Sequence, residues 1–373
     1  MAMKCFTASS VPLLSMFISR TPYAIMSGSR SVSYQCKKLS FNEFGDPLKV
    51  VYPDEEAVSE PSASEVLVKI LVAPVNPADI NIIQGTYPVK PSLPASPGFE
   101  GVGEVVAVGT GVTEFAVGDR VVPNCDTCGT WKSYTKFSSD GLLKVPNDMP
   151  ILEAAGLTSN PCTAYRMLSD FTELKPGDAV IQNGANSACG QNVIQLCKAW
   201  GITSVNIVRD RPNLNELKEH LSSLGADHIL IESELRSTQL FKSKEVPFPK
   251  LALNCVGGNN ATEVMRHLAP KGVMVTYGGM SRNPVTIPTS SFIFKDLAFR
   301  GFWMTRWHKE NRNSPARQKM IADLVELMKS KKIKAPAHKV VPLENYTEAL
   351  MNTMSVQGFA GHKYFIDFRS LHS

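Results

Sequence analysis

The stretch that decides the fold is Ala179-Val-Ile-Gln-Asn-Gly-Ala-Asn-Ser-Ala-Cys-Gly-Gln191, which leads to Ser204-Val-Asn-Ile-Val-Arg-Asp-Arg211. An apolar run at 179–182 enters a turn of small residues, after which apolar side chains from Val193 to Trp200 recur at helical spacing. Small residues in the turn allow a pyrophosphate to approach the backbone and the helix N-terminus, where free N–H groups favour negative charge. The stretch therefore predicts a dinucleotide-binding strand–helix–strand unit.

The glycine pattern of this turn is incomplete, because Ala188 stands where such loops usually have a second glycine between Gly184 and Gly190. Taken alone, the two glycines could serve only a tight strand-to-helix turn. The second strand, however, ends in Arg209, Asp210 and Arg211, at the distance from the loop where the ribose is recognised. An Asp between two guanidiniums suits a 2′-phosphate better than a 2′-hydroxyl, so we predict NADPH as the cofactor.

Sequence patterns divide the chain into two domains. Residues 36–158 show short strand patterns at 66–72, 101–108, 120–123 and 131–137 with frequent glycines, as in a β-rich, barrel-like domain. Residues 159–300 alternate strands at 179–182, 204–208, 228–231, 251–255 and 273–277 with helices such as 213–224 and 261–268, which predicts a doubly wound parallel sheet of the α/β class. Residues 301–373 contain a helix at 315–331 and a closing strand at 363–368, and we expect them to return to the first domain.

The N-terminal residues have the composition of a targeting segment. Residues 1–33 contain Lys4, Arg20 and Arg30, many serines and no acid, so we predict a mitochondrial transit peptide over 1–35. The alternative is a secretory signal with its apolar region at 11–18, which the nucleotide fold and the unpaired-looking cysteines disfavour. The whole chain carries a formal charge of +5, and without these three cations +2, so nothing implies binding to nucleic acid. No apolar run is long enough to span a bilayer.

Cys125 and Cys128 form the one closely spaced cysteine pair among eight cysteines. A structural zinc needs four ligands, and no second pair at suitable spacing follows. We therefore predict that both are loop thiols and that the protein has no metal site.

Several motifs together resemble a known family. Gly98-Phe-Glu-Gly-Val-Gly-Glu-Val-Val-Ala-Val-Gly109 and Val117-Gly-Asp-Arg-Val121, in this domain order, resemble the medium-chain dehydrogenase/reductase superfamily. Within it, the motifs at 76–87, 160–167, 206–212, 253–258 and 275–280 resemble the mitochondrial trans-2-enoyl-acyl-carrier-protein reductases, and the likeness extends from residue 36 to the C-terminus. The resemblance implies a GroES-like catalytic domain of residues 36–158 and 301–373 and an NADPH-binding Rossmann domain of residues 159–300.

What the resemblance implies about function is specific. Such enzymes reduce trans-2-enoyl thioesters, carried by acyl carrier protein or CoA, to saturated acyl thioesters in mitochondrial fatty acid synthesis. Hydride goes to C3 and a proton to C2. The resemblance also implies the mitochondrial matrix as location and a homodimer as assembly. Phe99 stands where the zinc-dependent members have a histidine ligand, which agrees with the absence of a metal site.

The resemblance also assigns roles to residues. It makes Tyr87 the proton donor, whereas without it Tyr87 could be a packing tyrosine. It places Asn160 at the cofactor, where a helix cap is the alternative. The other residues that the resemblance places at the cofactor are Asn186, Ser187, Ala188, Cys189, Phe302, Trp303, Met304 and Lys363. To these we add Arg209, Asp210 and Arg211 from the strand-end motif, and Tyr277, Gly278, Gly279 and Met280 because they follow the fifth strand at its carboxyl end, where ligands bind in open sheets. For 302–304, a simple core segment remains the alternative.

Two other functions remain open at this point. A quinone oxidoreductase of the same superfamily also lacks zinc and uses NADPH, and a non-catalytic nucleotide-binding interaction protein is favoured only by Ala188. The lysines of 329–334 are either a solvated helix end or a docking surface for an acidic carrier protein.

Overall fold

The computed structural model describes residues 33–124, 128–355 and 362–372. The expected transit peptide therefore falls outside the described residues up to position 32, but its last three residues, 33–35, lie in the first strand, β1 (Ser33–Ser40). Among the described residues, no helix combines the length and apolar character needed to cross a bilayer.

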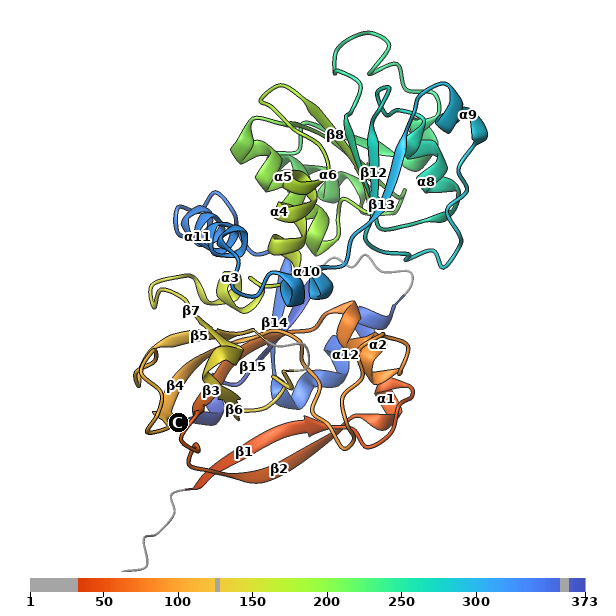
Figure 1. The fold of residues 1–373 in the computed structure, drawn as a ribbon. Coiled ribbons are helices and arrows are strands. Elements are labelled where there is room, and N and C mark those ends of the chain that lie inside the picture. Colours follow the sequence, from red (N-terminus) through yellow and green to blue (C-terminus); the bar gives the residue numbers. More distant parts are fainter. Residues whose placement is uncertain (1–32, 125–127, 356–361, 373) are drawn as a thin grey trace, which may run out of the picture. The chain divides into compact units, whose positions relative to one another are not determined.

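Six parallel strands form the sheet that the nucleotide motif predicts (Figure 1). Their order is β10–β9–β8–β11–β12–β13: strands β8 to β10 are added in one direction and strands β11 to β13 in the other, so the topological switch point lies between β8 and β11. The strands are β8 (Ala179–Asn183), β9 (Thr203–Val208), β10 (His228–Ile231), β11 (Leu251–Asn254), β12 (Val273–Thr276) and β13 (Ala298–Gly301). The doubly wound parallel sheet and its first five strands are thus confirmed, whereas β13 was not predicted.

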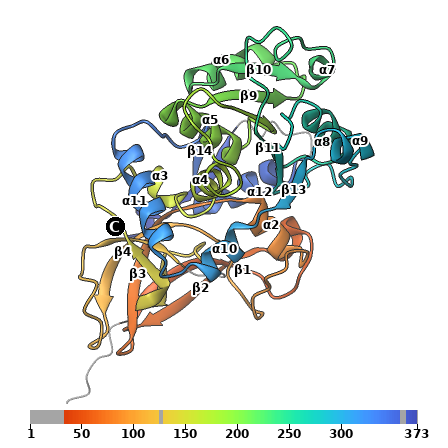
Figure 2. The same ribbon diagram turned by 45° about the horizontal axis from the view of Figure 1, so that its top comes forward.

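Helices cover both faces of this sheet, with α4 and α5 on one side and α8 and α9 on the other (Figures 1 and 2). Alternation along β8 explains the two faces: Val180 packs in the core below α4 and α5, whereas Ala179 and Ile181 pack in the core below α8. The helices are α4 (Asn160–Asp170), α5 (Ala188–Trp200), α6 (Leu214–Ser223), α7 (Glu232–Leu235), α8 (Gly258–Met265) and α9 (Thr289–Ile293).

A second, mixed sheet has the strand order β14–β15–β3–β4–β5–β7, with β6 paired to β3. Its strands are β3 (Glu65–Pro74), β4 (Val102–Val108), β5 (Arg120–Pro123), β6 (Tyr134–Ser138), β7 (Leu142–Lys144), β14 (His338–Pro342) and β15 (Lys363–Asp367). The C-terminal strand β15 pairs with β3, so the end of the chain lies in the same mixed sheet as residues 65–144. A separate hairpin of β1 and β2 (Tyr52–Ser59) was not predicted.

The remaining helices are α1 (Pro47–Val50), α2 (Pro77–Ile83), α3 (Ile151–Ala155), α10 (Met304–Glu310), α11 (Pro315–Lys329) and α12 (Tyr346–Met354). Of these, α3, α10 and α11 lie in the segments that connect the two sheets, and α1, α2 and α12 lie between strands outside the parallel sheet. One apolar core runs through both sheets: it contains Val72, Val102 and Phe365 from the mixed sheet and Val180 and Leu251 from the parallel sheet. The parallel sheet and the mixed sheet are therefore packed on a shared set of buried side chains.

Candidate active site

Tyr87 follows helix α2 in a short, tightly held turn. Gly85 has φ +70°, and a Cβ there would come within 2.9 Å of Phe44, so the position requires glycine. The backbone N–H groups of Thr86 and Tyr87 both donate to the carbonyl of Asn81, at 2.9 and 3.1 Å. These hydrogen bonds fix the backbone of the turn that carries the Tyr87 phenol.

The Tyr87 hydroxyl contacts two side chains that lie more than 200 residues away in sequence. The indole Nε1–H of Trp303 donates to the Tyr87 oxygen at 2.7 Å, and the two rings meet edge to face with centroids 5.9 Å apart. The Thr305 hydroxyl lies 3.5 Å from the same oxygen. An indole can only donate, so the Trp303 bond leaves the phenolic proton available to an acceptor outside this pair.

A pocket borders Thr305, whose hydroxyl lies 3.5 Å from the Tyr87 oxygen; Tyr87 itself does not line this pocket. Its wall contains Thr305, Thr158 and Phe99, and also the imidazole of His308. His308 donates from Nε2 to the Thr158 carbonyl at 2.8 Å and accepts at Nδ1 from Arg317 at 3.1 Å, so it is neutral. Burial lowers the pKa of His308 to about 4, which agrees with this arrangement.

The turn after β8 is built for close approach of a ligand to the backbone. Gly184 has φ +59°, and a Cβ there would lie 2.5 Å from the Cys255 sulfur, while a Cβ at Gly190 would lie 2.7 Å from the Ala185 carbonyl oxygen. Ser187 caps α5 by accepting from the Gly190 N–H at 3.1 Å. The 13-residue helix thus presents its N-terminus at this turn, an arrangement that fits a pyrophosphate. Ala188, the first residue of α5, has no positive φ and needs no glycine.

Arg209, Asp210 and Arg211 directly follow β9, the neighbour of β8. Parallel strands end at one edge, so the arginines lie at the same edge of the sheet as the Gly184 turn. Arg209 and Asp210 are exposed and Arg211 is half-buried. Burial lowers the pKa of Arg211, and neighbouring Arg209 lowers it further. Arg209 and Arg211 are neighbouring cations that repel each other, and a dianionic phosphate beside them relieves this repulsion.

Residues 277–280 leave the same edge after β12. The Tyr277 hydroxyl lies next to the buried thiols of Cys189 and Cys255, and burial raises its pKa. Gly279 and Met280 are exposed. The side chain of Cys189 points into the core, so of this residue only the backbone faces the turn where Asn186 and Ser187 lie half-buried.

The segment Phe302–Met304 divides between core and site. Met304 is buried in the core shared by the sheets, and Phe302 packs edge-on against Phe171 with centroids 5.9 Å apart. Only Trp303 reaches Tyr87. Phe302 and Met304 thus pack as a core segment, whereas Trp303 does not.

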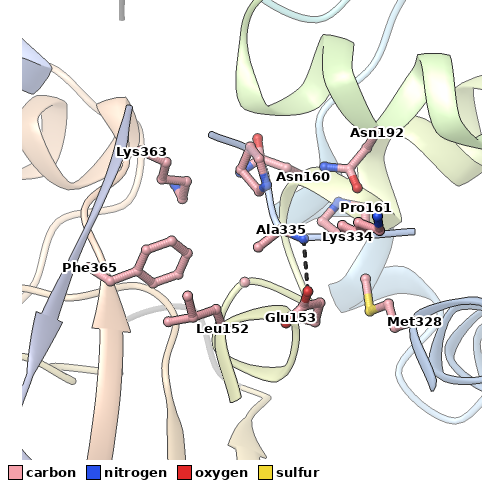
Figure 3. Close-up of a pocket in the computed structure, with 12 residues that line it drawn as sticks. Leu152, Glu153, Asn160, Pro161, Asn192, Met328, Lys334, Ala335, Lys363 and Phe365 are labelled. Atoms are coloured by element: carbon pink, nitrogen blue, oxygen red, sulfur yellow. Dashed lines mark hydrogen bonds between the residues drawn. The ribbon is translucent and has the colours of Figure 1, made fainter. Parts of the chain in front are cut away.

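Asn160 and Lys363 lie at a cavity of about 300 Å³ and face it from α4 and from β15 (Figure 3). Asn160 is the first residue of α4, and Ser159 occupies the N-cap, so Asn160 is not the cap. Its amide Nδ2 donates to Asn76 Oδ1 at 3.4 Å, and Lys363 Nζ donates to the same oxygen. The sequence placed both residues at the cofactor but gave no sign that they meet through Asn76.

Two buried carboxylates complete this cluster. Glu100 accepts from Asn76 Nδ2 at 3.0 Å and from the Ser159 N–H at 2.7 Å. Asp79 accepts from the Asn76 N–H at 2.7 Å. Burial raises the pKa of Glu100 and raises that of Asp79 to about 7, while burial lowers the pKa of Lys363.

Comparisons with known proteins agree with these features. The family model of the alcohol dehydrogenase GroES-like domain matches residues 62–147, and that of zinc-binding dehydrogenases matches residues 188–321. The human mitochondrial enoyl-[acyl-carrier-protein] reductase is 48% identical over 320 residues, which cover 85% of each chain. The chain belongs to the mitochondrial enoyl-[acyl-carrier-protein] reductase family. The resemblance in sequence is thereby confirmed.

Solved structures show that this reductase is also similar to known proteins in its three-dimensional fold. The Etr1p complex with NADP and crotonyl-CoA is 33% identical, with a TM-score of 0.83 over 90% of this chain and all of that one. The mitochondrial 2-enoyl thioester reductase heterodimer Etr1p/Etr2p from Candida tropicalis is 32% identical, with the same TM-score and coverage. The fold is therefore a GroES-like domain joined to a Rossmann domain.

Phe99, which the sequence resemblance aligns with the zinc ligand of related dehydrogenases, lines the pocket beside Thr305. In the part of the chain that the structure describes, no three His, Cys, Asp or Glu side chains are grouped to hold a metal ion. The prediction that Cys128 is a loop thiol is wrong, because this residue is disulfide-bonded. Cys125 lies outside the described residues.

Proposed function

We propose that the protein is an NADPH-dependent reductase of trans-2-enoyl thioesters that works in mitochondrial fatty acid synthesis. The observation that carries the proposal is the Tyr87 phenol, whose oxygen accepts from Trp303 and lies 3.5 Å from the hydroxyl of Thr305, a residue that lines a pocket. The family membership and the solved Etr1p complex with NADP and crotonyl-CoA support the substrate and cofactor class.

The chemistry that NADPH supplies is a hydride to C3 of the enoyl group. Tyr87 donates its hydroxyl proton to C2. Negative charge then develops on the phenolic oxygen, and the Trp303 Nε1–H, already 2.7 Å from that oxygen, stabilises it without rearrangement.

We further propose how residues 159–300 hold the cofactor. The backbone of Asn186, Ser187, Ala188 and Cys189 receives the pyrophosphate, and Arg209 and Arg211, on either side of Asp210, receive the 2′-phosphate. Asn160, Tyr277, Gly278, Gly279, Met280, Trp303 and Lys363 surround the nicotinamide half, with Phe302 and Met304 supporting Trp303 from the core. Residues 36–158 and 301–373 supply the substrate side.

NADPH oxidation followed at 340 nm tests the function directly. Protein that begins at Ser33 is mixed with a trans-2-enoyl-CoA or, separately, with a quinone, and each reaction is repeated with NADH. We expect oxidation only with the enoyl thioester and much faster with NADPH. Turnover of the quinone alone would support a quinone oxidoreductase instead. Tight NADPH binding without turnover of either substrate would support a non-catalytic nucleotide-binding protein.

We propose acyl carrier protein as well as CoA as the carrier of the acyl group. Lys331, Lys332 and Lys334 are exposed at the end of α11, whereas Lys329 forms an ion pair with Asp148 at 2.9 Å. Exposed lysines of this kind complement an acidic carrier.

We propose that two copies pair along β13, the edge strand of the parallel sheet. Phe292 contacts Phe299 of β13 with ring centroids 5.4 Å apart, and neighbouring Ile293 and Phe294 are 67% and 79% exposed. Apolar side chains this exposed at an open strand edge are typical of an interface. We expect the wild type to sediment as a dimer and Phe294→Asp as a monomer.

The matched control is Val117→Asp. Val117 is 66% exposed and lies between β4 and β5 of the mixed sheet, so it does not belong to the β13 edge. This variant should remain dimeric. A monomeric wild type, or a dimeric Phe294→Asp, would contradict pairing along β13.

A further inference from the structure

Asn76 is the meeting point of four elements. Its backbone N–H bonds Asp79 of α2, its Nδ2 bonds Glu100 before β4, and its Oδ1 accepts from Lys363 of β15 and from Asn160 of α4. The residue is 4% exposed, and Glu100 is 1% exposed. Every polar atom of the Asn76 side chain is thus used inside the protein.

The direction of each hydrogen bond is fixed by chemistry. Lys363 can only donate, so the Asn76 oxygen must face it, and the Asn76 nitrogen must then face an acceptor, which Glu100 provides. The other carboxylate oxygen of Glu100 accepts from the Ser159 N–H at 2.7 Å and from the Thr158 hydroxyl at 3.1 Å. Glu100 therefore links Asn76 to Thr158 and Ser159, the two residues that directly precede α4.

These bonds connect the two parts of the proposed active site. Asn76 caps the N-terminal side of α2, and the turn that follows α2 carries Tyr87. Asn160 and Lys363 face the cavity of Figure 3, on the side of the proposed cofactor. A shift of Asn76 would move Tyr87 relative to Asn160 and Lys363.

We propose that Asn76 and Glu100 are positioning residues that fix the distance between the proton donor and the cofactor-binding side chains. The proposal rests on the proposed function for its kinetic consequence. Neither residue contacts the reacting atoms; both act through Tyr87, Asn160 and Lys363. A misplacement of this kind lowers turnover and cofactor affinity together.

Variants that exchange the hydrogen-bond donor and acceptor between positions 76 and 100 test this proposal. Asn76→Asp faces one carboxylate with another, and Glu100→Gln brings two N–H donors together whichever way the amides are turned. The double variant N76D/E100Q restores a donor opposite an acceptor with the same net charge. We expect each single variant to lower kcat and to weaken NADPH binding, measured by fluorescence without substrate, by about tenfold or more. The double variant should recover both to within about threefold.

Glu153→Gln is the matched control, since Glu153 lines the same cavity and only its Oε1 is used, by the Ala335 N–H at 3.0 Å. It should keep wild-type kcat and affinity. Single variants with wild-type values, or a double variant no better than the worse single one, would overturn the proposal. A lower melting temperature with unchanged kinetics would show a purely structural role and also overturn it.

If Asn76→Asp alone does not fold, recovery of folded, NADPH-binding protein in the double variant is the expected result, and failure to recover it would overturn the proposal. The NADPH titration is independent of turnover. A wild type without enoyl reductase activity would therefore refute the proposed function while leaving the test of this pair intact.

Discussion

Tyr87→Phe is expected to reduce kcat by about 10²- to 10⁴-fold, the range that loss of a general acid produces. The variant keeps the aromatic ring against Trp303 but removes the only proton that the phenol can donate. The ring and the turn that holds it remain, so NADPH affinity should stay within about twofold of the wild type. Stopped-flow oxidation of NADPH with an enoyl-CoA, together with a fluorescence titration of NADPH, measures both quantities.

The control for this variant is Tyr346→Phe. Tyr346 is a packing tyrosine whose hydroxyl donates to the Val51 carbonyl at 3.2 Å, away from the Tyr87 site. Its loss should leave kcat within about twofold, because a single hydrogen bond contributes about 0.5–1.5 kcal/mol to stability and this one takes no part in the proton transfer. An unchanged kcat in Tyr87→Phe would remove this residue from the mechanism.

Replacement of both arginines after β9 should abolish the preference for NADPH over NADH. Hydrogen bonds to charged groups contribute about 1.5–3 kcal/mol, so Arg209→Ala and Arg211→Ala should each lower kcat/KM for NADPH roughly 10- to 100-fold. NADH has no 2′-phosphate, so its kcat/KM should change little. Steady-state rates with both cofactors at fixed enoyl-CoA give the ratio.

Arg266→Ala provides the comparison for a lost surface cation. Arg266 follows the C-terminal end of α8, so the strand–helix connection places it away from the carboxyl edge of the sheet, and it pairs with Glu263 at 3.4 Å. It should leave both cofactors unaffected. Equal losses for NADPH and NADH in the variants of Arg209 and Arg211 would show that these residues hold the cofactor elsewhere than at the 2′-phosphate.

The sequence was sufficient for those parts of the molecule that local patterns determine. Alternating burial along β8 and the helical spacing of α5 follow from nearby residues, and so do Gly184 and Gly190, where a Cβ has no room. The β1–β2 hairpin was missed because β2, Tyr-Pro-Asp-Glu-Glu-Ala-Val-Ser, is polar and mostly exposed, so its side chains give no clear period of two.

Contacts between distant residues account for what could not be predicted at the site. Trp303 and Thr305 meet Tyr87 across more than 200 positions, and no local feature of their segment indicates a hydrogen bond to a phenol. Asn76 was noticed only as part of a motif, because its bond to Glu100 joins two loops whose approach depends on the whole mixed sheet. In both cases, packing between elements supplies the information.

The buried side chains common to the two sheets determine how the molecule loses its structure. Val102 and Phe365 from one sheet and Val180 and Leu251 from the other belong to a single core, so neither sheet can melt without uncovering the other. Heating should therefore give one cooperative transition, with near-UV and far-UV signals changing at the same temperature. A fragment of residues 159–300 cut out of the chain would carry an uncovered apolar face and would aggregate instead of serving as a separate cofactor-binding module.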